Sequence, residues 1–199
     1  WSFFDLIVAP EHDDVPPHGN VVEVKGVLNG VPFVSNKKKN QGLMLIGGES
    51  SHFMWDSHAI IDQVSKIVEH DKEASWVLTT SRRTPEDFIQ LLLDRIPFDN
   101  MTVIQFEDTD QDWMMEQFSR AGQIWVTPDS VSMVYESLSS GAEVWVFSMD
   151  TLHPRNQSRV AKGLNDLIEQ SYISTFEQWY VDPLSTVLTK EFNESDRVA

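Results

Sequence analysis

The stretch Gln41-Gly-Leu-Met-Leu-Ile-Gly-Gly48 decides the fold class of this chain. Its centre, Leu43–Ile46, is a short apolar run that Gly47-Gly48 ends at once. A short run that is apolar at every position is typical of a parallel β-strand buried on both faces of its sheet. Runs of the same kind, rich in β-branched or aromatic residues, recur at Trp76–Leu78, Met101–Phe106, Ile124–Val126 and Val144–Phe147.

Amphipathic stretches separate these runs and predict helices. The first, residues 57–70, places five apolar residues on one helical face. Thr84 and Asp87 predict a capping box at the start of the second helix, and Gly141 predicts the end of the fourth. The remaining helices are predicted over residues 85–96, 111–120, 130–140 and 156–170. Five strand–helix units in succession predict an α/β fold with a Rossmann-like, doubly wound parallel sheet.

The amino-terminal end follows a different pattern. Residues 4–9 and 21–28 are strand-like, but no helix is predicted between them. A polar segment, Asn36–Gly42, then precedes the first strand–helix unit. We therefore predict that residues 1–35 are the remnant of an N-terminal domain, mostly absent from a chain that begins without Met. Residues 36–199 would form the Rossmann-like domain with a C-terminal helical tail.

Composition and charge exclude several classes of protein. The 199 residues include 15 Lys and Arg against 31 Asp and Glu, which gives a net charge of −16. Such a chain lacks the basic face that binding of nucleic acid or of an anionic membrane requires. Without cysteine it has no disulfide, no thiol catalysis and no Cys-ligated metal. With no apolar run of 18 residues and no signal peptide, the sequence predicts a cytoplasmic protein. No metal site is predicted.

The segment from Val126 to Glu136 carries the strongest candidate site. A buried strand ends at Thr127, and a helix is predicted to start near Ser130. The free N–H groups and positive dipole end of a helix N-terminus can bind an anion. Asp129 and Glu136 are two helical turns apart, and a carboxylate at Glu136 could accept hydrogen bonds from ribose hydroxyls. The same residues are also typical of ordinary helix capping and of a solvated helix face.

Two more polar segments follow predicted strands. Gly47-Gly48 would let a backbone approach a ligand, although two glycines are also common in simple turns. Ser81-Arg82-Arg83 offers guanidinium donors suited to phosphate, although flanking arginines can equally pair with acids. Because the carboxyl ends of parallel strands share one edge of the sheet, all these segments should converge. The convergence predicts an anionic ligand that carries a diol, namely a nucleotide diphosphate.

A fourth loop, Glu11-His12-Asp13, follows the first predicted strand. An imidazole between carboxylates could serve as a general base near neutral pH. We take His12 as the first candidate for such a base, with Glu11 and Asp13 beside it. A solvated acidic loop would have the same composition.

Several segments together resemble the mitochondrial-fission ELM-type family, which is predicted to contain GT-B-like glycosyltransferases. They are Phe4–Asp13, Leu43–Gly48, Thr80–Pro85, Val126–Glu136 and Trp179–Leu184. The resemblance implies a two-domain architecture of which this chain is the C-terminal half. It also implies a nucleotide-diphosphate sugar as donor substrate, with no other cofactor. The diphosphate would lie on Ser130, Ser132 and Met133 and near the glycine pair, the ribose would lie on Glu136, and the two arginines would lie close to the phosphates.

Two functions remain open at this point. The first is a glycosyltransferase that transfers the sugar to an envelope glycan or lipid-linked acceptor. On that interpretation, residues 1–199 alone would bind nucleotide but turn over poorly, and any peripheral membrane contact would come through the missing N-terminal domain. The second is a non-catalytic nucleotide-sugar-binding or scaffold relative in a membrane or envelope assembly.

Overall fold

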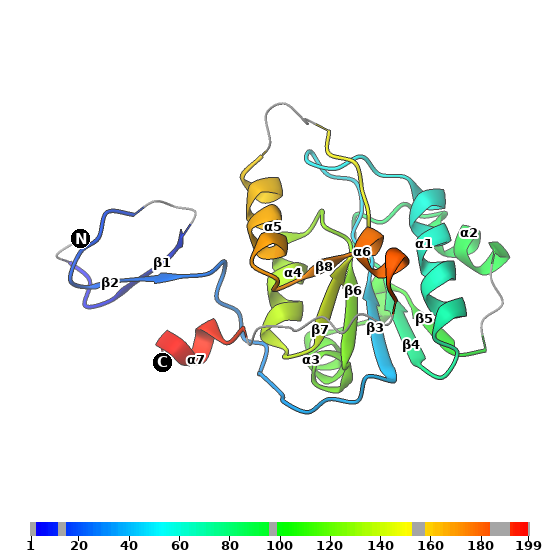
Figure 1. The fold of residues 1–199 in the computed structure, drawn as a ribbon, viewed down its shortest axis with the longest axis horizontal. Coiled ribbons are helices and arrows are strands. Elements are labelled where there is room, and N and C mark those ends of the chain that lie inside the picture. Colours follow the sequence, from blue (N-terminus) through cyan, green and yellow to red (C-terminus); the bar gives the residue numbers. More distant parts are fainter. Residues whose placement is uncertain (1–2, 12–14, 96–98, 153–157, 184–191, 199) are drawn as a thin grey trace.

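The computed structural model describes residues 3–11, 15–95, 99–152, 158–183 and 192–198. Its main feature is a six-stranded sheet in the order β5-β4-β3-β6-β7-β8, in which every neighbouring pair is parallel (Figure 1). The strands are β3 (Gln41–Leu45), β4 (Ser75–Thr79), β5 (Met101–Ile104), β6 (Gln123–Val126), β7 (Glu143–Val146) and β8 (Ser174–Thr175). The predicted Rossmann-like α/β class is confirmed, and all five predicted strands of this sheet are present.

Helices connect the strands much as the sequence predicts. They are α1 (Ser57–His70), α2 (Phe88–Arg95), α3 (Gln111–Arg120), α4 (Val131–Ser139), α5 (Arg159–Glu169) and α6 (Phe176–Val181). A 3₁₀ turn over Phe106–Asp108 precedes α3. Helices α1 and α3 have the predicted bounds. Helix α4 ends as predicted, because Gly141 adopts a φ of 81° and its N–H donates to the carbonyl of Leu138 at 3.2 Å.

The predicted capping box at Thr84 and Asp87 is wrong, and α2 begins at Phe88 instead. The hydroxyl of Thr84 donates to the carbonyl of Gly47, and it also lies 3.2 Å from the carbonyl of Ile46. Thr84 therefore ties the loop before α2 to the end of β3 and does not cap a helix.

Both faces of the sheet are buried, as strand alternation requires. Along β3, Met44 lies on the face covered by α1, α2 and α6, and Leu43 and Leu45 lie on the face covered by α3, α4 and α5. Strand β6 alternates in the same way, with Trp125 on the first face. This arrangement explains why the strands show continuous apolar runs.

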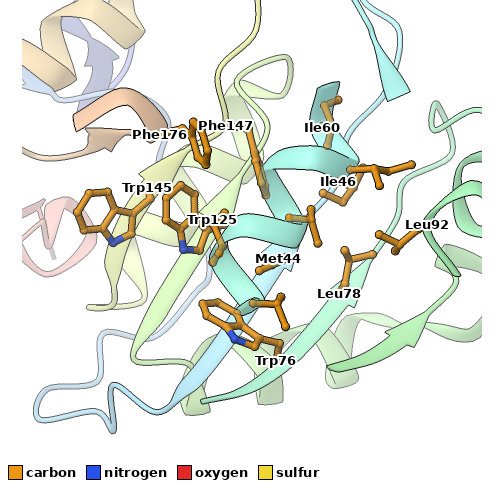
Figure 2. Packing of buried hydrophobic residues seen from close by; sticks show 14 of the residues in the cluster. Met44, Ile46, Ile60, Trp76, Leu78, Leu92, Trp125, Trp145, Phe147 and Phe176 are labelled. Atoms are coloured by element: carbon orange, nitrogen blue, oxygen red, sulfur yellow. The ribbon is translucent and has the colours of Figure 1, made fainter. Parts of the chain in front are cut away.

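Tryptophan residues fill much of the first face (Figure 2). Trp125 stacks on Trp145 with ring centroids 5.4 Å apart and an interplanar angle of 14°. The Trp76 ring packs so closely on Gly42 that a Cβ there would lie 2.2 Å from a ring carbon. These aromatic side chains therefore belong to the core on this face of the sheet.

The amino-terminal segment forms a separate two-stranded parallel sheet of β1 (Ile7–Pro10) and β2 (Val21–Val24). Figure 1 shows this pair beside the six-stranded sheet, next to the last helix, α7 (Glu194–Val198). The backbone N–H of Lys25 donates to Glu194 at 2.9 Å, and Arg197 donates to the carbonyl of Glu23. Phe3, Phe4 and Leu6 are exposed. The division at residues 35 and 36 stays a prediction.

Candidate functional site

The candidate site lies where the strand order reverses. Strands β4 and β5 extend from β3 in one direction, and β7 and β8 extend from β6 in the other. Doubly wound sheets bind ligands in the crevice outside the carboxyl ends of the two strands at such a switch point. Gly47-Gly48 follows β3 and Thr127–Ser130 follows β6, so the two predicted segments meet at this point.

The glycine pair is held tightly from the β6 side. The N–H of Gly47 donates to Thr127 Oγ1 at 2.7 Å, and the N–H of Gly48 donates to Asp129 Oδ2 at 3.0 Å. A Cβ on Gly47 would lie 2.3 Å from both carboxylate oxygens of Asp129, and one on Gly48 would lie 2.0 Å from the carbonyl oxygen of Arg83. Neither glycine has a positive φ. Crowding by neighbouring loops therefore requires glycine here.

Arg83 and Asp129 form an ion pair between two strand-end loops. Arg83 Nη2 donates to Asp129 Oδ2 at 2.7 Å, and the Asp129 side chain is 0% exposed. Arg83 Nη1 donates to the carbonyl of Glu49 at 2.8 Å. Asp129 precedes the N-cap residue Ser130, so it lies outside α4 and does not share the helix face of Glu136. Of the two alternatives for the arginines, pairing with an acid is therefore the one that Arg83 adopts.

The other predicted residues of the arginine loop have different positions. Ser81 shapes the turn, because its hydroxyl accepts from the N–H of Arg83 at 3.2 Å. The guanidinium carbon of Arg82 lies 5.0 Å from the centroid of the Phe106 ring. This stacking contact with the Phe106 ring does not use the N–H donors of Arg82.

The N-terminus of α4 differs from those of α1 and α3. Asp56 caps α1 and Asp110 caps α3 through their side chains, whereas Ser130 makes no side-chain capping bond to α4. Ser132 is exposed and Met133 is partly buried in the first turn. Ser130 therefore does not satisfy the orphan N–H groups of this turn, and such groups can bind an anion.

Glu136 lies one turn further along α4 and is half-buried. Burial raises the pKa of its carboxyl group above the ordinary value. Among the described residues, no hydrogen-bond donor reaches this carboxylate. A half-buried acid without a donor is suited to accepting hydrogen bonds from a ligand.

The candidate base loop is only partly described. His12 and Asp13 lie outside the described residues. Glu11 is exposed and lines a cavity of about 280 Å³ together with Lys25, Tyr135 and Asp166. Burial, Asp166 and Glu11 all raise the pKa of the Tyr135 hydroxyl. Nothing in the sequence pointed to Tyr135, because an aromatic residue on an apolar helix face gives no signal of facing a cavity.

The described ranges of the chain lack two features. They contain no group of three or more His, Asp or Glu residues placed to hold a metal ion. Within the same ranges, no helix combines the length and the apolar character needed to cross a bilayer.

Solved structures share this fold at low sequence identity. MurG from Acinetobacter baumannii matches 98% of the chain with a TM-score of 0.52 and 12% identity, and TarM matches 99% with a TM-score of 0.58 and 10% identity. A putative UDP-N-acetylglucosamine 2-epimerase from Listeria monocytogenes matches 81% with a TM-score of 0.50 and 13% identity. The chain spans 59% of the MurG structure and 40% of each of the other two.

These likenesses define the class of protein: the chain has the α/β fold of GT-B glycosyltransferases and spans about half of such structures. More particularly, it belongs to the family described as Mitochondrial fission ELM1, whose family model matches residues 1–199. The resemblance stated from the sequence is confirmed. No curated protein matches the chain in sequence.

Proposed function

We propose that this chain is the donor-binding half of a glycosyltransferase that uses a nucleotide-diphosphate sugar. The observation that supports this proposal most directly is the uncapped N-terminus of α4 at the switch point of a GT-B-type sheet. The first-turn N–H groups, with the hydroxyls of Ser130 and Ser132, would bind the diphosphate, and Met133 would contribute its backbone. The helix dipole favours the same negative charge.

Glu136 would hold the ribose. Its carboxylate lies in the second turn of the same helix, half-buried and without a described donor, so it can accept hydrogen bonds from two neighbouring hydroxyls. Because burial raises its pKa, ionisation of Glu136 is costly in the empty protein, and ribose hydroxyls would compensate part of that cost. This chemistry supports a nucleotide rather than inorganic phosphate alone.

Transfer would release the nucleoside diphosphate as leaving group. The N-terminus of α4 would stabilise the negative charge that develops on the diphosphate as the glycosidic bond breaks. A base from the N-terminal side would take the acceptor's hydroxyl proton, and Glu11, His12 and Asp13 are our candidates for it. The acceptor would be an envelope glycan or a lipid-linked sugar. The name of the Listeria structure adds support for a uridine diphosphate sugar as donor.

One observation favours a second function, a non-catalytic nucleotide-sugar-binding or scaffold protein. Arg83 is committed to Asp129, which leaves Arg82 and the helix dipole as the positive elements among the described residues of the predicted phosphate site. Weak stabilisation of a leaving group would suit binding without transfer.

Thermal denaturation of the chain with nucleotides tests the proposal. We expect one nucleoside diphosphate, or its sugar, to raise the melting temperature, because a ligand that binds the folded state stabilises it by mass action. The matched nucleoside without phosphates is the control and should stabilise far less. If UDP, GDP, ADP and their sugars all leave the melting temperature unchanged, the donor-binding proposal is wrong.

A further inference from the structure

We infer that Arg83 and Asp129 form a positioning pair for the phosphate site, so that Arg83 acts on a bound phosphate through Asp129 and Gly48 rather than by direct contact. This inference rests on the proposed function, and it assigns to Arg83 a role different from the direct phosphate contact that was one of the two alternatives for the arginines.

The geometry of three loops supports the first step. Asp129 Oδ2 receives the guanidinium of Arg83 at 2.7 Å and the N–H of Gly48 at 3.0 Å. Arg83 Nη1 also donates to the carbonyl of Glu49, and the hydroxyl of Thr84 donates to the carbonyl of Gly47. The loops after β3, β4 and β6 are therefore joined through a single carboxylate oxygen. Releasing Arg83 would leave the Gly48 N–H as the described hydrogen-bond partner of this oxygen.

Electrostatics supports the second step. The Asp129 carboxylate is fully buried and stands two residues before the helix whose N-terminus would receive the diphosphate. Its second oxygen, Oδ1, is buried and has no hydrogen-bond partner in the described part of the chain. Among the described residues, Arg83 is thus the one cation that compensates this charge. Without Arg83, an uncompensated carboxylate would repel the phosphates.

The two roles for Arg83 predict different behaviour when Asp129 is neutral. If Arg83 binds phosphate directly, its loss weakens binding whatever residue stands at position 129. If Arg83 serves to hold and neutralise Asp129, its loss is harmless once position 129 is Asn. Asparagine keeps an oxygen that can accept the Gly48 N–H and carries no charge.

A double-mutant cycle separates these roles. The proteins are the unchanged chain, Arg83→Gln, Asp129→Asn and the double variant, and the probes are inorganic pyrophosphate and UDP in titration calorimetry. We expect Arg83→Gln to weaken pyrophosphate binding at least about tenfold in the native background, and to change it less than about threefold in the Asp129→Asn background. The exposed pair Arg95–Asp62, with side chains 63% and 51% exposed, provides a matched control cycle that should show no effect on binding.

The outcomes are distinguishable. If Arg83→Gln in the Asp129→Asn background still weakens binding tenfold or more, Arg83 contacts the phosphate and the inference is wrong, while the proposed function stands. If Arg83→Gln alone fails to fold, the comparison between Asp129→Asn and the double variant still decides the question. If the unchanged chain binds none of pyrophosphate, UDP, GDP and ADP, the proposed function is wrong. The inference, which rests on it, is then wrong as well.

Discussion

The two sides of the switch point differ sharply. On the β3 side, the Gly47-Gly48 loop is saturated with contacts to Thr84, Thr127 and Asp129. On the β6 side, helix α4 begins with Ser130 contributing no capping bond. One side is a rigid scaffold and the other leaves hydrogen-bonding capacity unused. Preorganised loops beside an unsatisfied helix end are what an anion site requires, because the protein then does not reorganise on binding.

Substitutions in the Gly47-Gly48 loop, on the β3 side, should have the largest effect on stability. A Cβ on Gly48 would meet backbone atoms of Arg83 at 2.0 Å and 2.1 Å, which no rotamer change can relieve. We expect Gly48→Ala to lower the free energy of unfolding by about 3 kcal/mol, measured by urea denaturation. Gly30→Ala is the matched control, since nothing lies within 4 Å of its Cβ position, and it should change stability by less than about 0.5 kcal/mol. Equal effects of the two substitutions would show that the β3 side is not crowded.

Substitutions on the β6 side, in helix α4, should change ligand affinity more than the stability of the fold. Glu136→Ala removes an acceptor for the ribose hydroxyls, and we expect nucleoside diphosphate affinity to fall by roughly 10- to 100-fold, or about 1.5–3 kcal/mol. Titration calorimetry measures this loss. The affinity for inorganic pyrophosphate, which has no ribose, should be retained. A nucleotide affinity that survives Glu136→Ala would remove this residue from the site.

A smaller effect is expected in the pH dependence of stability. Because burial raises the pKa of Glu136 in the folded state, the unionised carboxyl is favoured there. Its contribution to stability is complete below the unfolded pKa of about 4.3 and is lost as the pH rises through the folded value. Glu136→Gln cannot ionise, so its stability relative to the unchanged chain should increase over this range. Parallel unfolding curves at about pH 4 and pH 7 measure the difference, and a Glu136→Gln variant that gains nothing at neutral pH would contradict the assignment.

The smallest effect concerns the helix caps. Asp56 accepts from the N–H of Ala59 at 3.1 Å, and Asp56→Ala should cost about 1 kcal/mol of stability. Ser130 makes no such bond, so Ser130→Ala should cost less than about 0.5 kcal/mol. Thermal unfolding of both variants compares the two ends. Equal losses would mean that Ser130 caps α4 after all, and that the contrast between the two sides of the switch point is weaker than the structure indicates.

Local sequence patterns predicted the central strands well because β3, β6 and β7 are buried on both faces. Leu43–Ile46 and Val144–Phe147 are continuous apolar runs for that reason, and their predicted positions agree with β3 and β7 within two residues. The sequence also predicted that Gly47-Gly48 and Thr127–Ser130 lie close together, because the carboxyl ends of parallel strands share one edge of the sheet. The ribose and phosphate roles assigned from the sequence stay predictions.

What the sequence did not reveal depends on contacts between distant loops. Arg83 and Asp129 are 46 positions apart, and nothing in either segment indicates that they pair. Thr84 matched a capping pattern, but its hydroxyl bonds to carbonyl groups at the end of β3 instead. One signal was available: Asp129 lies three residues after the apolar run of β6, close to the core, and an acid that is buried there needs a cation.

The contacts of the last helix also have a mechanical consequence. Phe192 packs on Tyr135 of α4 and on Tyr172, which lies between α5 and β8. Two positions later α7 begins, and its side chains bind the backbone beside β2. The small parallel pair is therefore joined to the large sheet by its own linker and by the returning end of the chain. Any movement of the small pair away from the large sheet would therefore have to carry α7 with it or break the hydrogen bonds of Glu194 and Arg197 to the backbone of Lys25 and Glu23.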